Sequence, residues 1–231
     1  MMTAPAWQWN EAKQIGTDYE NVDEVRAYDH RMGELRDIPA ENQTILNLLR
    51  LPPGAAVLEI GTGTGAFARE AARAGHRVTA LDISPVMLAY AAERVREERL
   101  AGIRFVQAGF LTYGHAGEPF DAVVSGLALH HLPDLWKFNA LKRIHDWLRP
   151  GGRFLLQDVV FDPGPEGFAA YFDRLTAAMP ADSRQPFIRH IRQEYSTLTW
   201  IMEGLLRRGG FAVEQSWQLS DFMSQYLCRA G

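Results

Sequence analysis

Short apolar runs alternate with amphipathic stretches along most of this chain, which predicts strands alternating with helices. The runs that we expect to form strands are 57–60, 76–82, 103–107, 120–125 and 153–160. Helical patterns lie between them, after Gly65, after Ser84-Pro85 and from Asp134 to about Leu148. This alternation is typical of a parallel sheet whose strands are joined by crossover helices. The sequence therefore predicts an α/β fold.

The end of the chain has a different pattern. Gly209-Gly210 ends a helical stretch, and the apolar-polar alternation of 211–218 and 222–229 predicts two further strands. Their connection is so short that it permits only antiparallel pairing. We expect five parallel strands to be closed by this hairpin.

Two segments lie outside the strand–helix alternation. Residues 1–50 contain apolar side chains at helical spacing between Val22 and Leu35, and a second helix is expected after Pro39. Residues 161–196 form a helical insertion between the fifth and sixth strands. We expect both segments to cover the carboxyl ends of the strands, where open α/β sheets bind ligands. The alternative is that one of them forms a dimer interface.

Composition and charge narrow the function classes. The 231 residues are 47% hydrophobic and 23% charged, with a formal net charge of −4 and a single cysteine, Cys228. No apolar run is long enough for a membrane span, and no secretory signal is visible, so we expect a cytoplasmic protein. The arginines are scattered, which favours a small-molecule partner over nucleic acid or a membrane. We expect a monomer or a homodimer.

A glycine-rich segment follows the first predicted strand. Glu59 precedes Gly61, Gly63 and Gly65, and a helical pattern begins directly afterwards. Glycine permits a sharp turn and close approach of a ligand, and a helix start offers free N–H groups. The dinucleotide fingerprint has the different spacing G-x-G-x-x-G. Because the carboxylate of Glu59 would repel a pyrophosphate, we expect a nucleotide cofactor that is positively charged and lacks phosphate.

At these residues the chain resembles the class I S-adenosylmethionine-dependent methyltransferases, whose first motif is (D/E)-x-G-x-G-x-G. Residues 128–134 resemble the stretch ALHHLPD of small-molecule methyltransferases such as those of quinone biosynthesis, and 148–152 resemble a later LKPGG motif. The resemblance covers about residues 54–160. It implies a Rossmann-like three-layer sandwich with strand order 3-2-1-4-5-7-6 and an antiparallel strand 7. One domain, 1–231, then comprises an N-terminal helical lid (1–50), a cofactor-binding core (54–160), a helical insertion (161–196) and a final helix with hairpin (197–231).

The resemblance implies a site for S-adenosylmethionine and its product S-adenosylhomocysteine. Asp82 ends the second strand, where a carboxylate can accept hydrogen bonds from ribose hydroxyls. Gly109 stands where relatives carry an acid that binds adenine, so backbone groups of Gly109 and Phe110 are expected to replace it. The other residues implied in cofactor binding are Tyr28, Arg31, Glu59, Gly61, Thr62, Gly63, Gly65, Ile83, Met87, Ser125 and Gly126.

Methyl transfer needs a base only if the acceptor must lose a proton. His130, and less strongly its neighbour His131, are candidates because they follow the fourth strand on the expected methyl side. Tyr19, Glu194, Tyr195 and Trp200 are candidates for the acceptor pocket. His145 and His190 have no partner at a spacing typical of metal ligands, so no metal site is expected.

Two alternatives to a methyltransferase are a non-catalytic binding protein and a nicotinamide oxidoreductase. The chain could hold the cofactor as a non-catalytic sensor or partner subunit. A nicotinamide oxidoreductase is opposed by the glycine spacing, by Glu59 and by the final hairpin. The acceptor molecule and the attacking atom cannot be named from these residues.

Overall fold

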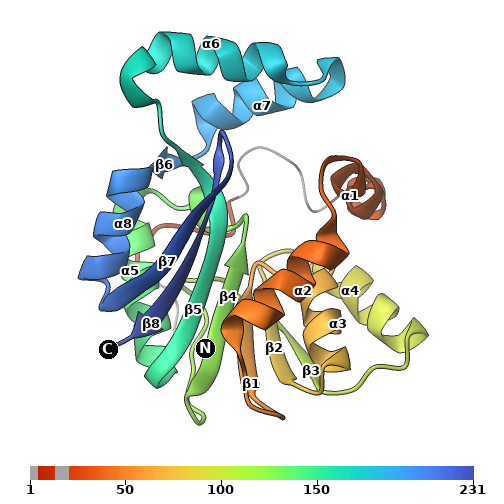
Figure 1. Ribbon diagram of the computed structural model, residues 1–231. Coiled ribbons are helices and arrows are strands. Elements are labelled where there is room, and N and C mark those ends of the chain that lie inside the picture. The colour runs from red at the N-terminus through yellow and green to blue at the C-terminus, as the bar shows by residue number, and fades with distance from the viewer. Residues whose placement is uncertain (1–4, 14–20) are drawn as a thin grey trace.

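A single sheet with helices on both faces forms the body of the protein (Figure 1). The computed structural model describes residues 5–13 and 21–231, without the side chains of residues 28, 30, 31, 34 and 35. The strands are β1 (Ala56–Ile60), β2 (Arg77–Asp82), β3 (Ile103–Gln107), β4 (Phe120–Gly126), β5 (Leu148–Phe161), β6 (Thr197–Leu198), β7 (Phe211–Ser220) and β8 (Met223–Ala230). The helices are α1 (Val22–Leu35), α2 (Ile38–Leu49), α3 (Ala66–Arg73), α4 (Pro85–Glu97), α5 (Asp134–Trp147), α6 (Phe168–Ala178), α7 (Ala181–Gln193) and α8 (Thr199–Arg208), with 3₁₀ turns η1 (Leu129–His131) and η2 (Gly164–Glu166).

The strand order is β3-β2-β1-β4-β5-β8-β7. Strands β1 to β5 are parallel, and β8 pairs antiparallel with both β5 and β7. The predicted order is confirmed, with β7 and β8 as the sixth and seventh strands of the sequence analysis. The structure differs from the predicted sheet by one additional strand, the two-residue β6, which pairs with the end of β5. So short a strand has too little periodicity to be recognised in a sequence.

The sheet separates two hydrophobic cores, because successive side chains of a strand point to opposite faces. On β1, Val57 packs in the cluster of α2 and α3, and Leu58 packs in the cluster of α5 and α8. Helices α2, α3 and α4 cover one face, and α5 and α8 cover the other (Figure 1). Ile45 and Leu49 of α2 belong to the first cluster. This part of the segment expected as an N-terminal lid is therefore a layer of the sandwich.

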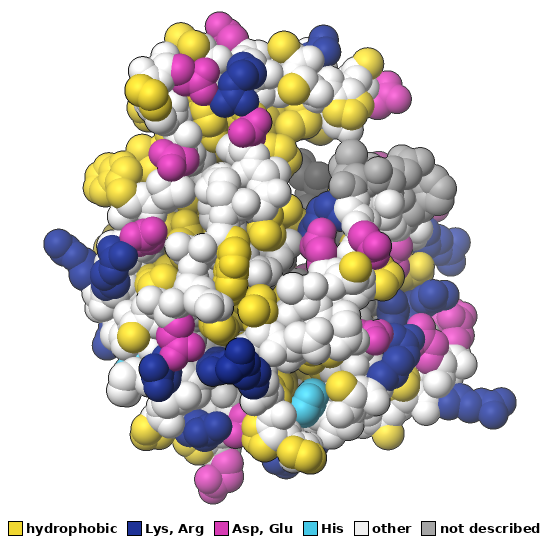
Figure 2. All heavy atoms as spheres, viewed as in Figure 1, with side chains coloured by type: hydrophobic (Ala, Val, Ile, Leu, Met, Phe, Trp, Pro, Cys, Tyr) yellow, Lys and Arg dark blue, Asp and Glu magenta, His cyan; other side chains and the backbone are white. Residues whose placement is uncertain are grey.

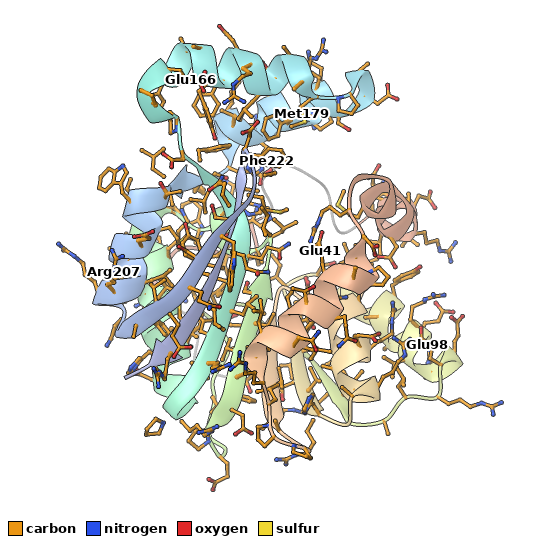
Figure 3. All side chains as sticks on the ribbon, viewed as in Figure 1. Glu41, Glu98, Glu166, Met179, Arg207 and Phe222 are labelled. Atoms are coloured by element: carbon orange, nitrogen blue, oxygen red, sulfur yellow. The ribbon has the colours of Figure 1, made fainter. Side chains whose placement is uncertain are left out.

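The insertion lies beyond the carboxyl end of β5, where a cover was expected (Figure 1). Tyr171 and Leu175 of α6 are buried against Val159 and Phe161 at the end of that strand. Phe187 of α7 contacts Phe222 with ring centroids 5.0 Å apart, and Figure 3 shows Phe222 at the tip of the β7–β8 hairpin. Hydrophobic contacts thus hold α6 and α7 against the end of the sheet.

Surface charge is mixed in sign on the face drawn in Figure 2, where basic and acidic side chains of the described residues alternate. None of the helices described is both long and apolar enough to cross a membrane.

Candidate functional site

A cleft of about 830 Å³, part of it open to solvent, lies at the carboxyl ends of β1, β2 and β4. Residues that end these strands or follow them form its wall, as expected for an open α/β sheet. The wall contains eight of the predicted cofactor residues: Gly61, Gly63, Asp82, Ile83, Met87, Gly109, Phe110 and Gly126. It also contains Glu11, Lys13, Ile60, Ala108, Leu127, Ala128, His131 and Leu132. One cavity therefore unites the glycine loop, the acid of β2 and the turn after β4.

The glycine loop packs directly on the turn after β4. Gly61 has a φ of +77°, and a β-carbon there would lie 2.4 Å from the β-carbon of Ala128. Gly65 has a φ of +74° at the start of α3, and its β-carbon would lie 3.0 Å from that of Ala91. Both positions need a left-handed backbone and leave little room for a side chain. The backbone of the loop can therefore pack closely on Ala128 and Ala91 and form the bottom of the cleft.

Asp82 joins the glycine loop to α4. Its Oδ2 accepts a hydrogen bond from the Gly63 amide at 2.8 Å, and its Oδ1 accepts one from the Ser84 amide at 2.9 Å. Ser84 in turn caps α4 by accepting from the Met87 amide. Burial raises the pKa of Asp82 above its usual value. The carboxylate thus faces the cleft from a position that backbone donors fix.

Glu59 lies behind the glycine loop and not on the cleft wall. Its Oε2 accepts a hydrogen bond of 2.6 Å from the Thr62 hydroxyl, and burial raises its pKa to about 8. Ser125 is also behind the wall, where its hydroxyl donates to the Ile60 carbonyl at 3.0 Å. The predicted residues Glu59, Thr62, Gly65 and Ser125 therefore support the wall.

Helix α1 is attached to the glycine loop by the Thr64 hydroxyl, which donates to Asp29 Oδ1 at 2.6 Å. Tyr28 and Arg31 flank Asp29 on this helix, and their side chains lie outside the described part of the structure. Tyr19, a candidate for the acceptor pocket, also lies outside the described residues. The roles expected for all three stay predictions.

Glu11 is a wall residue that the sequence analysis missed. Its carboxylate accepts hydrogen bonds from the Leu111 amide at 3.0 Å, the Thr112 amide at 2.7 Å and the Thr112 hydroxyl at 2.6 Å. These groups follow β3, beside Gly109, where relatives were expected to carry an acid. No motif surrounds Glu11, so the only signal was the missing acid at position 109.

The two candidate histidines face different surroundings. His131 lines the cleft, whereas His130 is buried behind it. Nδ1 of His130 lies 2.5 Å from Asp158 Oδ1, and its Nε2 lies 3.1 Å from Glu194 Oε2. Burial acts to lower the pKa of His130, but the two carboxylates outweigh it and raise the pKa to about 9. Burial and the adjacent His130 lower the pKa of His131 to about 4.

The structure places the other candidates for the acceptor pocket in two different regions. Glu194 contacts both His130 and His190; burial acts to raise its pKa, but hydrogen bonds from these histidines hold the pKa below its usual range. Tyr195 follows it and donates its amide to the His130 carbonyl at 2.9 Å. Trp200 is 70% exposed on α8 and is not on the cleft wall. Glu194 is thus next to the candidate histidines, whereas Trp200 is exposed on α8.

Comparison with known proteins identifies relatives of the chain. A model of the methyltransferase domain matches residues 57–152. An uncharacterized methyltransferase of Anoxybacillus flavithermus (strain DSM 21510 / WK1) is 30% identical over 184 residues, covering 78% of this chain and 80% of that protein. Phosphoethanolamine N-methyltransferase 2 of Caenorhabditis elegans is 32% identical over 145 residues, covering 61% of this chain and 32% of that protein.

A solved structure has the same architecture. Phosphoethanolamine N-methyltransferase 2 of Haemonchus contortus, in complex with S-adenosyl-L-methionine, matches with a TM-score of 0.71. The match covers 93% of this chain and 60% of that chain at 18% identity, so it supports the fold alone. The glycine motif, the sheet order and the sequence relatives agree: the chain belongs to the Rossmann-like, S-adenosylmethionine-dependent methyltransferases.

Proposed function

We propose that this enzyme transfers the methyl group of S-adenosylmethionine to a small-molecule acceptor bound in the cleft. The observation that carries the proposal is the meeting of the glycine loop, Asp82 and His131 on one cleft wall. The net charge of −4 and the scattered arginines also favour a small acceptor over nucleic acid. A cytoplasmic location stays a prediction.

The wall residues suggest how the cofactor would lie. The methionine part would follow the glycine loop toward Gly126, and the ribose hydroxyls would donate to Asp82. The adenine ring would lie between Ile83 and Met87 on one side and Phe110 on the other. Glu59 would act on the cofactor ammonium through Thr62 or a water molecule, because it stands behind the loop.

We further propose that Glu11 accepts a hydrogen bond from the exocyclic amine of adenine. A β-carbon on Gly109 would lie 2.5 Å from Glu11 Oε2, so the Glu11 carboxylate occupies the space of a side chain at position 109. Its Oε1 receives three of the hydrogen bonds from residues 111 and 112, while Oε2 receives one. Oε2 therefore keeps lone-pair capacity for a ligand.

The chemistry is an in-line displacement at the methyl carbon. A lone pair of the acceptor atom forms the new bond to carbon, the carbon–sulfur bond breaks, and its electron pair stays on sulfur as a neutral thioether. The chain's main task is to hold the acceptor near attack distance and to exclude water. His131, which lines the cleft, is the better candidate to hydrogen-bond the acceptor, and His130 would position it from behind.

Calorimetric titration with S-adenosylhomocysteine, with NAD as the control ligand, tests the cofactor assignment. Saturable binding of S-adenosylhomocysteine alone is expected, and binding of NAD alone would overturn it. Turnover is then tested by incubating the enzyme with S-adenosylmethionine and a panel of small acceptors, while S-adenosylhomocysteine is quantified. The panel includes phosphoethanolamine, amines, phenols and thiols. Stoichiometric methylated product would exclude the alternative of a non-catalytic sensor or partner subunit, whereas binding without any turnover would favour it.

A further inference from the structure

Two histidines and a carboxylate meet between the core and the insertion, next to the cleft. His130, His190 and Glu194 each contribute one potential ligand atom, and these atoms all lie within 4.8 Å of one another. We propose that these residues bind one divalent transition metal ion, with zinc as the preferred ion, and that the ion fastens the insertion to the core. Metal binding is independent of the proposed methyl transfer and is tested separately.

The two distances from Glu194 to the histidine nitrogens are close to those of a tetrahedral site. Bonds of about 2.0–2.2 Å to nitrogen and oxygen place tetrahedral ligand atoms about 3.3–3.5 Å apart. Glu194 Oε2 lies 3.1 Å from Nε2 of His130 and 2.8 Å from Nδ1 of His190. Small side-chain movements would therefore admit the ion in place of the shared protons. A water molecule can complete the fourth position, as in other zinc sites with three protein ligands.

The outer nitrogens of both histidines already have oxygen partners. Nδ1 of His130 lies 2.5 Å from Asp158 Oδ1, and Nε2 of His190 lies 2.7 Å from the Ser196 hydroxyl. Metal-binding histidines almost always bond their second nitrogen to such a group, which fixes the ring and its tautomer. In this cluster the second bond turns the other nitrogen of each ring toward Glu194. This pattern is the strongest argument for a metal ion over a simple hydrogen-bond network.

Charge and burial give a second, independent argument. Side-chain exposure is 0% for Asp158 and 9% for Glu194, so two carboxylates are buried near each other. Oδ2 of Asp158 is buried with no hydrogen-bond partner among the described residues. Nζ of Lys137, a buried cation nearby, is bonded to Asp134 and to the Tyr195 carbonyl. A divalent ion would replace the proton that His130 shares with these carboxylates and would balance both charges, which are costly to bury without compensation.

The cluster joins elements that are distant in sequence. His130 lies in η1 after β4, Asp158 lies in β5, and His190 and Glu194 lie at the end of α7. We expected no metal site from the sequence, because these ligands come from separate elements and have no characteristic spacing along the chain. An ion here would connect α7 to the core beside the hydrogen bond from the Tyr195 amide to the His130 carbonyl.

The test uses the full chain after removal of metal with a chelator. Titration with Co²⁺, followed by its visible absorption, and calorimetric titration with Zn²⁺ report the stoichiometry and affinity. We expect one ion per chain with an affinity about tenfold or more weaker in His190→Gln and in Glu194→Gln, and unchanged in His115→Gln, whose ring packs on Phe120 outside the cluster. Equal affinity in His190→Gln and His115→Gln, or binding of less than one equivalent by the unaltered chain, would overturn the proposal.

Folding of each variant is checked by titration with S-adenosylhomocysteine, whose predicted site does not include these side chains. If His190→Gln does not fold, Ser196→Ala replaces it, since loss of the outer partner is expected to weaken metal binding about tenfold. Zinc should also raise the thermal unfolding temperature of the unaltered chain and not that of Glu194→Gln. Equal shifts in both proteins would show that the ion binds elsewhere.

Discussion

The carboxylate of Glu11 occupies the space into which a side chain at Gly109 would extend. Oε2 of Glu11 lies 2.5 Å from the position of a β-carbon on Gly109, and the carboxylate binds the Leu111 and Thr112 amides just beyond. A residue near the amino end of the chain thus supplies a carboxylate at the end of the third strand.

Glu11→Ala is expected to weaken S-adenosylhomocysteine binding by about 1.5–3 kcal/mol, because the adenine amine would lose a charged acceptor. Calorimetric titration measures the change. The corresponding inosine compound lacks this amine, so its affinity should be low in the unaltered enzyme and little affected by the substitution.

A compensating variant distinguishes the carboxylate from a general loss of structure. Gly109→Asp combined with Glu11→Ala should recover part of the lost affinity, because the new carboxylate starts from the space that Glu11 vacates. Gly109→Asp alone should weaken binding, since both carboxylates would compete for that space. If the double variant binds S-adenosylhomocysteine no better than Glu11→Ala does, the proposal that Glu11 binds the adenine amine is wrong.

Asp82→Ala is expected to lower cofactor affinity by about 1–3 kcal/mol, because the ribose hydroxyls would lose their charged acceptor and the Gly63 amide would lose its partner. Asp121→Ala is the matched control, since Asp121 binds the Ala56 amide and Arg149 and is not part of the cleft wall. Titration of both variants with S-adenosylhomocysteine gives the comparison. Unchanged binding in Asp82→Ala would remove this residue from the site.

Cofactor binding is expected to release a proton from Glu59 near pH 7. Burial raises the pKa of this carboxyl to about 8, so the ligand-free protein carries it mostly protonated at pH 7. The ammonium of the ligand favours the ionised form and lowers this pKa, so affinity should increase from pH 6 to pH 7.5, by up to about tenfold per unit. Calorimetry at pH 7 in buffers of different ionisation enthalpy measures the proton release.

The same titrations with Glu59→Gln provide the control, because an amide has no proton to release. Binding by this variant should be weaker and independent of the buffer. A binding enthalpy of the unaltered protein that is also independent of the buffer would contradict the prediction.

Gly61→Ala is expected to destabilise the fold and to abolish cofactor binding. A left-handed backbone costs an alanine about 1–2 kcal/mol, and the contact of 2.4 Å with Ala128 adds about 1–3 kcal/mol. Gly54→Ala is the matched control, because Gly54 has a φ of +71° and open space around its β-carbon position. Urea unfolding measures both variants. Equal losses of stability would mean that the loop moves away from Ala128 without cost.

Hydrophobic periodicity and glycine spacing made most of the fold predictable. Local signals define each of the five parallel strands, and Ser84 with Pro85 defines the start of α4. The position of α2 was not predictable, because Ile45 and Leu49 form an apolar stripe that suits either a lid or a sandwich layer. Only packing against Val57 and Phe67 distinguishes the two.

The cleft wall was predictable to the extent that its residues follow strand ends in sequence motifs. Eight residues predicted from these motifs line the cleft. Glu11 and the contacts among His130, His190 and Glu194 depend on long-range packing, which leaves no local pattern in the sequence. The placement of His131 on the cleft wall and of His130 behind it has the same origin, since His130 is paired with Asp158 and Glu194.

Adjacent residues of β5 make polar contacts on opposite faces of the sheet. Gln157 binds Glu41 of α2, while Asp158 binds His130, whose ring also contacts Glu194 of the insertion. Because successive side chains of a strand point to opposite faces, inserting or deleting a single residue before position 157 would exchange their directions. Both polar connections would then fail together, so the length of this strand is under tighter constraint than its apolar composition suggests.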